Sequence, residues 1–344
     1  MLLKDTIIDL CGLSAPSGFE DSVFDRAKAF LSPYADDIRT DAMGNLIAVR
    51  KCGRPNAKTL MFDAHIDEIG LIVTGIEKGF LRFSGIGGVD PRMLPARELK
   101  LLTEPPIFGV IDTLPPHVLS SGDMDKAIDP EKLFIDVGLS EEAAEKRIPL
   151  GTPAVYAGGI ETLNGSVICG KSLDDRSCVA ILLQLMKRLS GEDLSVDVCC
   201  LLSTQEELGM RGAAAGVYGI DPDYAIVLDV TFAAAPDFKG PETLELRRGA
   251  AIGIGPGMDR GLTKALIKIA GDKGIPYQLE VMGGDSGTND RVIQVCREGV
   301  VTGLVSLPIR YMHSPVELMD ISDAEALVEL LTEFTLWLDK GELS

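Results

Sequence analysis

The sequence is poor in histidine, which makes the positions of its histidines informative. It also has no CxxC pair and no long apolar run, and each of these two absences argues against a class of protein. Histidine accounts for three of 344 residues. The seven cysteines are odd in number and lie mostly in apolar segments, which favours free thiols in a reducing cytoplasm over a disulfide framework or a cysteine-based zinc site. No apolar run is long enough to span a bilayer. Lys4, Asp5 and Asp9 interrupt the N-terminal segment, so we expect a cytoplasmic protein without a signal peptide.

Positive charge is also scarce. The formal net charge is -19, which argues against nucleic acid and anionic membranes as partners. Hydrophobic residues make up 46% of the chain, enough for a substantial core, and the length allows one large domain or two.

The pattern of apolar residues predicts an α/β core that is interrupted in sequence. Residues 1–31 have a helical pattern around the turn SAPSGFE, and 59–64 has the pattern of a buried strand. From about 69 to 156, short β-like runs alternate with Gly, Pro and Asp turns, which indicates an inserted small barrel or sandwich. The later elements are predicted as helices at 176–189 and 262–270, strands at 196–202, 224–228, 277–281 and 300–305, and a helix ending near 338 that opens with the capping box Ser322-x-x-Glu325.

Histidines and carboxylates occur where these predicted elements begin or end. They are His65, Asp174-Asp175, Glu206-Glu207, Asp229 (which would end strand 224–228) and His313. In open α/β sheets, ligands bind beyond the carboxyl ends of the strands, so these distant positions could converge. Imidazoles and carboxylates suit zinc-like metals. Two such sets sharing one carboxylate would hold two metals about 3.5–4 Å apart.

The two acidic doublets need a local explanation. Neighbouring residues of a strand point to opposite faces, so Glu206 and Glu207 can share a site only where the chain turns. One would then ligate metal, and the other would act as general base on the metal-activated water. Asp174-Asp175 poses the same problem, for which a strained or cis peptide bond is a solution. Asp67 can accept a hydrogen bond from the ring nitrogen of His65 that does not face the metal.

Each motif also has a simpler interpretation. Alone, the His-x-Asp motif fits a surface turn, the Asp doublet a helix cap, the Glu doublet a solvated face, and Asp229 a turn residue. His117 has no acidic companion and is interpreted as structural or surface. GGDSGT at 283–288 is similar to a serine-protease loop, but the α/β organisation argues against that class. The glycine-rich 252–257 lacks the dinucleotide spacing, and adjacent glutamates are poorly placed for a glycosidase.

Taken in order, eight segments resemble one family over nearly the whole chain: SAPSGFE, DAHIDEIG, GGVDPRMLPAR, LFIDVGLS, SLDDRS, STQEELGMRGA, VLDVTFA and RYMHSPVE. The family is that of the co-catalytic metallo-aminopeptidases, which includes glutamyl, deblocking and tetrahedral dodecameric aminopeptidases and some relatives labelled endoglucanase. The resemblance implies a mixed-sheet metallo-exopeptidase domain formed by residues 1–67 and 161–344. It also implies that residues 68–160 are an inserted β-barrel oligomerisation domain.

The resemblance also implies roles for the site residues. Asp174 would bridge two divalent metals, zinc or cobalt or else manganese, with His65 and Asp229 completing one site and Glu207 and His313 the other. Glu206 would be the general base, and Asp67 would orient His65. The implied activity is hydrolysis of N-terminal residues from peptides by a homo-oligomer, dimer to dodecamer. A deacylase acting on a non-peptide amide and a non-catalytic assembly protein are the alternatives. GGDSGTND at 283–290 departs from the usual Gly-Thr-Asp-Ala form, which affects the substrate pocket rather than the metal site.

Overall fold

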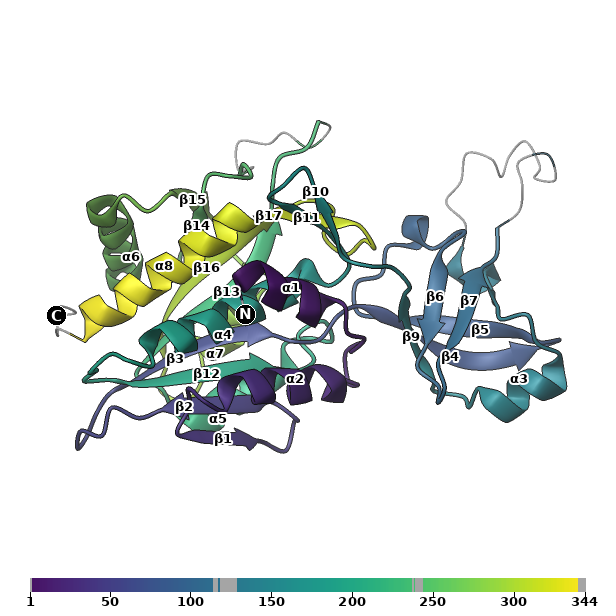
Figure 1. Cartoon of the computed structure of the whole chain (residues 1–344), viewed down its shortest axis with the longest axis horizontal. Coiled ribbons are helices and arrows are strands. Elements are labelled where there is room, and N and C mark those ends of the chain that lie inside the picture. The colour runs from purple at the N-terminus through teal and green to yellow at the C-terminus, as the bar shows by residue number, and fades with distance from the viewer. Residues whose placement is uncertain (1, 114–116, 118–128, 237, 239–243, 340–344) are drawn as a thin grey trace.

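A mixed eight-stranded sheet forms the larger part of the molecule, which the computed structural model describes over residues 2–113, 117, 129–236, 238 and 244–339 (Figure 1). In spatial order its strands are β1 (Asp37–Thr40), β2 (Leu46–Arg50), β12 (Asp197–Ser203), β3 (Thr59–His65), β13 (Tyr224–Phe232), β16 (Val301–Ile309), β14 (Ala250–Ile254) and β15 (Tyr277–Val281). The four central strands β12, β3, β13 and β16 are parallel, so their carboxyl ends lie at one edge. The predicted split α/β core with a mixed sheet is therefore confirmed.

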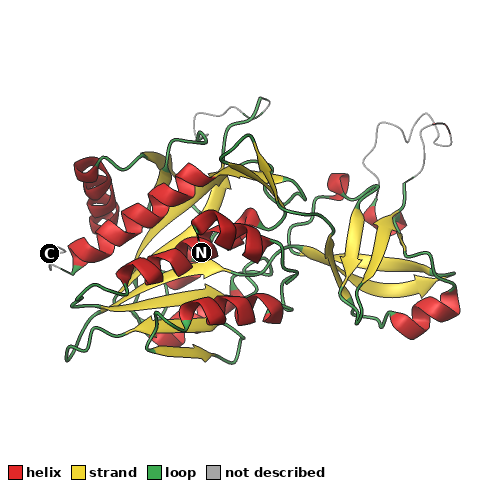
Figure 2. Cartoon of the chain, in the orientation of Figure 1, coloured by secondary structure: helices red, strands yellow, loops and turns green. Residues whose placement is uncertain are grey.

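Helices cover both faces of this sheet (Figure 2). One face packs against α1 (Leu3–Cys11), α2 (Asp21–Leu31), α4 (Leu173–Leu189), α6 (Arg260–Lys273) and α8 (Ile321–Leu338). The other packs against α5 (Arg211–Ile220) and α7 (Asp290–Ile293). Along β3, Leu60 and Phe62 join the first core and Met61 joins the second, as the alternation of a strand requires. Burial on both faces explains why β3 is a continuous apolar run in the sequence.

A closed six-stranded β-barrel lies at one end of the molecule, beside the sheet and its helices (Figure 1). Its strands in spatial order are β4 (Gly70–Glu77), β5 (Phe80–Ile86), β8 (Ile135–Asp136), β7 (Ile107–Ile111), β6 (Glu98–Leu101) and β9 (Pro153–Tyr156), and α3 (Glu141–Arg147) packs beside β4. Ile107 and Ile111 of β7 are buried, whereas Phe108 and Val110 between them are exposed. The predicted small β-barrel is confirmed; the domain boundaries at 67/68 and 160/161 stay predictions.

Three predictions about element ends were wrong. The strand predicted at 300–305 continues as β16 to Ile309. β13 does not end before Asp229, because it stays paired with β16 as far as Phe232. Helix α8 is capped by Asp320 rather than by the predicted Ser322, which lies in its first turn. The Asp320 carboxylate accepts the Ser322 N–H at 3.1 Å, and a carboxylate is stabilised at the positive end of a helix. Asp320 is also the last residue of β17 (Glu317–Asp320). This strand belongs to a small sheet that the sequence did not predict, together with β10 (Glu161–Leu163) and β11 (Val167–Gly170).

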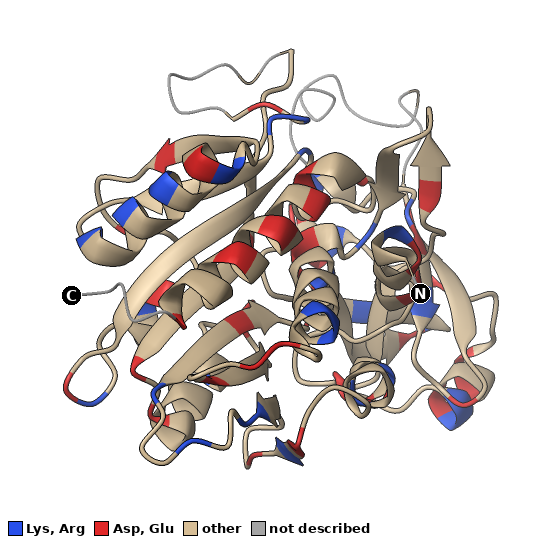
Figure 3. Ribbon diagram, turned by 60° about the vertical axis from the view of Figure 1, so that its left-hand side comes forward, with Lys and Arg blue, Asp and Glu red and all other residues tan. Residues whose placement is uncertain are grey.

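The excess of acidic residues is visible on helix α8. α8 contains no lysine or arginine and is banded only in red in Figure 3. Lys273 of the neighbouring α6 forms an ion pair with Glu333 of α8 at 2.6 Å, so part of this charge is locally balanced. Within the described ranges, no helix is both long enough and apolar enough to cross a membrane.

Candidate metal centre

The predicted histidines and carboxylates come together at the carboxyl edge of the parallel strands. His65 ends β3, Asp229 lies in β13, Glu206 and Glu207 follow β12, Asp174 opens α4, and His313 follows β16. Within the described residues, two groups of potential ligand atoms each lie within 4.8 Å of one another: His65, Asp175 and Asp229, and Asp174, Glu207 and His313. The third histidine, His117, is exposed and belongs to neither group.

Asp174 joins the two groups through its two carboxylate oxygens. Oδ1 lies 3.1 Å from His65 Nε2, and Oδ2 lies 3.2 Å from His313 Nε2. His313 Nε2 is also 3.2 Å from Glu207 Oε1, and His65 Nε2 is 3.9 Å from Asp229 Oδ1. The Asp174–Asp175 peptide bond is cis, which is one of the two solutions predicted for this doublet. One carboxylate facing two imidazoles with different oxygens has the arrangement that a bridging ligand needs.

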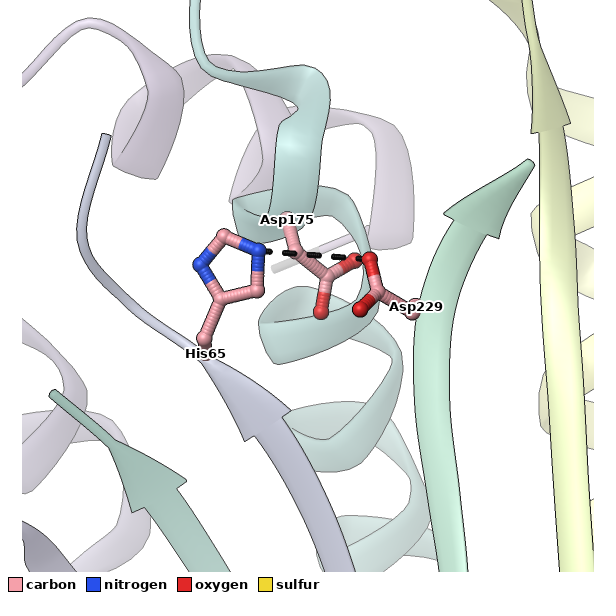
Figure 4. Close-up of side chains that lie close together, drawn as sticks. All are labelled: His65, Asp175 and Asp229. Carbon is pink, nitrogen blue, oxygen red and sulfur yellow. Dashed lines mark ion pairs between the residues drawn. The ribbon is translucent and has the colours of Figure 1, made fainter. Parts of the chain in front are cut away.

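Asp175 is the member of the cluster to which the sequence analysis assigned no role. Figure 4 shows its carboxylate beside the ring of His65 and the carboxylate of Asp229. Asp175 is fully buried, and among the described residues its oxygens have no donor near them except the weakly donating thiol of Cys178; burial raises the pKa of this carboxyl well above its usual range. A buried carboxyl group without a strong donor is unfavourable unless a proton or a cation is bound close to it. Asp175 is therefore a further candidate for holding a cation beside His65.

Asp67 connects His65 to the loop that carries both glutamates. Its Oδ1 lies 3.4 Å from His65 Nδ1, so the opposite nitrogen, Nε2, faces the cluster. Asp67 also accepts the backbone N–H groups of Glu206 at 3.1 Å and Glu207 at 3.2 Å. Although burial alone would raise the pKa of Asp67, the hydrogen bond and charge of His65 keep it below its usual value. One buried carboxylate thus positions three of the predicted site residues.

Glu206 stands apart from the ligand groups although it is adjacent to Glu207 in sequence. Its side chain lines the cleft in front of the cluster, and it belongs to neither group of ligand atoms. Burial raises the pKa of Glu206 to about 7, and the neighbouring Glu207 carboxylate adds to the rise. The geometry therefore separates the two glutamates, as expected for adjacent residues at a turn.

His313 is held by two groups that the sequence did not reveal. Its Nδ1 lies 3.1 Å from the backbone carbonyl of Gly88, in the loop after barrel strand β5. Its backbone N–H donates to Glu317 Oε1 at 2.9 Å, and the second oxygen of Glu317 accepts the Asp174 N–H at 3.1 Å. The barrel thus reaches the cluster through a main-chain oxygen, and Glu317 fixes the spacing of two predicted ligands. A carboxylate four residues after His313 was the available sequence signal for Glu317; Gly88 had none.

A network of buried ion pairs and hydrogen bonds connects the segments that carry His65 and Asp174. The fully buried Arg176 donates to the carbonyl oxygens of Ile66 at 3.0 Å and Ala15 at 3.1 Å, and to the Glu68 carboxylate at 3.0 Å. Lys171 also reaches Glu68, at 2.8 Å. Burial would raise the pKa of Glu68, but these two cations lower it to about 2. The network links the segment after β3 to the start of α4, and so fixes His65 relative to Asp174.

The electrostatics of the cluster favour positive charge. Burial alone would lower the pKa of His313, yet its hydrogen bonds to Asp174 and Glu207 raise it to about 11. Burial would likewise raise the pKa of Asp174, but the two histidines hold it well below its usual range. Positive charge at the imidazoles is strongly stabilised by the surrounding carboxylates, and a bound metal ion would take the place of those protons. Two imidazoles with several carboxylates fit zinc, cobalt or manganese.

Comparison with known proteins assigns the chain to a family. Residues 44–330 match the family described as M42 glutamyl aminopeptidase. The chain is 37% identical to a lysyl aminopeptidase of Pyrococcus furiosus, over 95% of this chain and 94% of that protein. A solved aminopeptidase of Desulfurococcus kamchatkensis superposes with a TM-score of 0.90 at 36% identity, covering 97% of this chain and 94% of its own. The Pyrococcus horikoshii TET1 peptidase, which can assemble into a tetrahedron or a large octahedral shell, gives 0.86 at 31% identity, covering 97% and 99%.

The chain therefore belongs to the M42 glutamyl aminopeptidase family, a group of hydrolases of the aminopeptidase class. The family resemblance found in the sequence is confirmed by this match.

Proposed function

We propose that this protein is an aminopeptidase that uses two divalent cations. Asp174 would bridge them, with His65 and Asp229 completing one site and Glu207 and His313 the other. The observation that supports this most directly is the position of Asp174, whose two oxygens lie 3.1 and 3.2 Å from different histidines. Asp175 is close enough to His65 and Asp229 to join the first site. Zinc or cobalt suits these ligands best, and manganese is compatible with them.

The chemistry divides between the cations and the chain. When bound, such a metal pair polarises a carbonyl oxygen and lowers the pKa of a water molecule to about 7. Glu206 would accept the proton of the attacking water and deliver it to the leaving amine. Its place at the cleft wall, outside both ligand groups, supports this role. Asp67 would act through its neighbours, because it holds the ring of His65 and the backbone of both glutamates.

The assembly is proposed to be a homo-oligomer held in part by the barrel. Phe108 and Val110 expose 66% and 47% of their surface on β7, where a partner subunit could cover them. A solved relative of similar fold can assemble into a tetrahedron or a large octahedral shell. In such a shell, access to the cleft would favour short peptides over folded proteins. The seven cysteines are all free thiols, which supports the proposal of a reducing, cytoplasmic setting.

The test is metal add-back combined with a choice of substrates. Chelated enzyme receives zinc, cobalt or manganese in increments, and hydrolysis of aminoacyl amides is followed beside the same amides with an acetylated amino group. We expect activity to require two metal equivalents per subunit and a free amino group. Preferential hydrolysis of the acetylated compounds would favour a deacylase. Tight binding of two metals without hydrolysis of any compound would favour a non-catalytic protein.

A further inference from the structure

A cleft extends from the metal cluster along the sheet and carries a carboxylate that the reaction does not use. Its volume is about 540 Å³. Its walls include the apolar residues Met282, Leu304 and Phe232. Residues 285–288 of the GGDSGTND segment also line it. Two acidic residues of the cleft are neither proposed ligands nor the proposed base. Asp285 is paired with Arg291 at 2.6 Å, whereas Glu280 of β15 is partly buried.

Glu280 reaches across one strand of the sheet. β14 lies between β15 and β16, yet the Glu280 carboxylate accepts a hydrogen bond from Ser306 Oγ of β16 at 2.7 Å. The hydroxyl of Thr231, from β13, donates to its other oxygen. The residue of β14 in register with Glu280 is Gly253, where a Cβ would lie 3.1 Å from Leu304 Cβ. The absence of a side chain at Gly253 leaves room for Glu280 to cross.

The carboxylate lies close to the cluster along the strands. Ser306 is paired directly with Asp229 in the register of β16 and β13. Thr231 is two residues after Asp229, so its side chain is on the same face, about 7 Å further along the strand. A long side chain bound at the cluster would therefore extend toward Glu280.

Glu280 has no positively charged partner in the described part of the chain. Its only side-chain partners there are the two hydroxyls. A carboxylate held by neutral donors in a partly buried cleft is costly to desolvate, and burial accordingly raises the pKa of Glu280. A cationic group on a ligand would supply the missing counter-charge. Lysine and arginine carry their charge at the end of a chain of methylene groups, and the apolar walls of the cleft would contact those groups.

We infer that Glu280 determines specificity by binding the cationic side chain of an N-terminal lysine or arginine. This inference rests on the proposed aminopeptidase function and deepens it. An N-terminal glutamate would place like charges together, so this chain is expected to reject the glutamyl substrates after which its family is described.

The test compares two substrates that differ only at the end of the side chain. Metal-replete wild-type enzyme is assayed with lysyl and norleucyl amides, which share the same carbon stem, and with arginyl and glutamyl amides. We expect kcat/KM for the lysyl amide to exceed that for the norleucyl amide by on the order of 10²-fold. Equal values for the two would overturn the assignment without any variant. Hydrolysis of none of the amides would overturn the proposed function, and this inference with it.

A variant then assigns the preference to one residue. Glu280→Gln should lose on the order of 10²-fold in kcat/KM on lysyl and arginyl amides, while the norleucyl amide stays within about threefold. Glu245→Gln is the matched control: Glu245 is exposed, pairs with Arg248, and its N–H bonds to Gln278 of the same β15, outside the cleft. An equal loss on every substrate in Glu280→Gln would mean that the residue binds the α-amino group or supports the fold, and would refute the side-chain role.

Discussion

Replacing Asp67 with asparagine would separate the positioning of the site from its chemistry. Asp67 is fully buried, accepts the N–H groups of Glu206 and Glu207, and faces His65 Nδ1 at 3.4 Å. Asparagine has nearly the same shape but only one acceptor oxygen. At least one of the two buried N–H groups would therefore lose its acceptor, and His65 would lose its anionic partner.

The expected size of each effect follows from these contacts. A hydrogen bond to a charged group contributes about 1.5–3 kcal/mol, so the free energy of unfolding of Asp67→Asn should fall by roughly that amount. Removing the partner of a ligating histidine typically costs about 10–100-fold in metal affinity, so the variant should need correspondingly more metal for half-maximal activity. Denaturant unfolding of the chelated protein and calorimetric titration with zinc would measure the two effects separately.

Asp323 offers a matched control in the same chain. It is also fully buried and accepts two backbone N–H groups, from Arg247 and Gly249, each at 2.7 Å. It belongs to neither ligand group. Asp323→Asn should therefore lose a similar amount of stability and keep the metal affinity of the wild type. Wild-type metal affinity in Asp67→Asn, or an equal loss of affinity in both variants, would refute the positioning role of Asp67.

Three further results are expected. Glu206→Gln should retain both metals and lose about 10²–10⁴-fold in turnover because the amide cannot accept a proton; near-wild-type turnover of the metal-replete variant would contradict its role as base. Metal analysis of Asp174→Ala should show loss at both sites, whereas His65→Ala and His313→Ala should each lose mainly one ion; two tightly held ions in Asp174→Ala would rule out the bridge. Light scattering should show an oligomer that Phe108→Asp converts to a smaller species, and a strictly monomeric wild type at micromolar concentration would reject the assembly role.

The sequence was most informative where a local pattern has a spatial consequence. His65 and the glutamate pair follow apolar runs that became parallel strands, so their convergence followed from the rule for strand ends. The adjacency of Glu206 and Glu207 predicted a turn, and the chain turns there, with Asp67 accepting both backbone N–H groups. An inserted barrel or sandwich was foreseen because its strands are short and separated by turn residues, and the family resemblance specified the barrel.

Other features could not be read from the sequence because they depend on partners far along the chain. Gly88 contacts His313 through a backbone oxygen, across 225 positions, and the segment GGVDPRMLPAR did not indicate that this oxygen would meet a histidine. Glu280 lies in an edge strand with exposed neighbours, where an acidic residue has an ordinary appearance. Its proposed role depends on its side chain reaching Ser306 of β16 past Gly253 of β14, and only the strand order reveals this arrangement. Asp320 was missed as a helix cap because Ser322 and Glu325 matched a familiar motif.

The contact between Gly88 and His313 limits how the barrel could be exchanged between relatives. A Cβ at Gly88 would lie 2.8 Å from His313 Nδ1, so any other residue there would push the imidazole away. The loop from β5 must also keep its length, since its carbonyl has to arrive at one ring nitrogen. A transplanted barrel with a different loop would produce a folded protein with a misaligned histidine. We therefore expect barrel and sheet to be inherited as a pair, and insertions in this loop to be the rarest in the barrel.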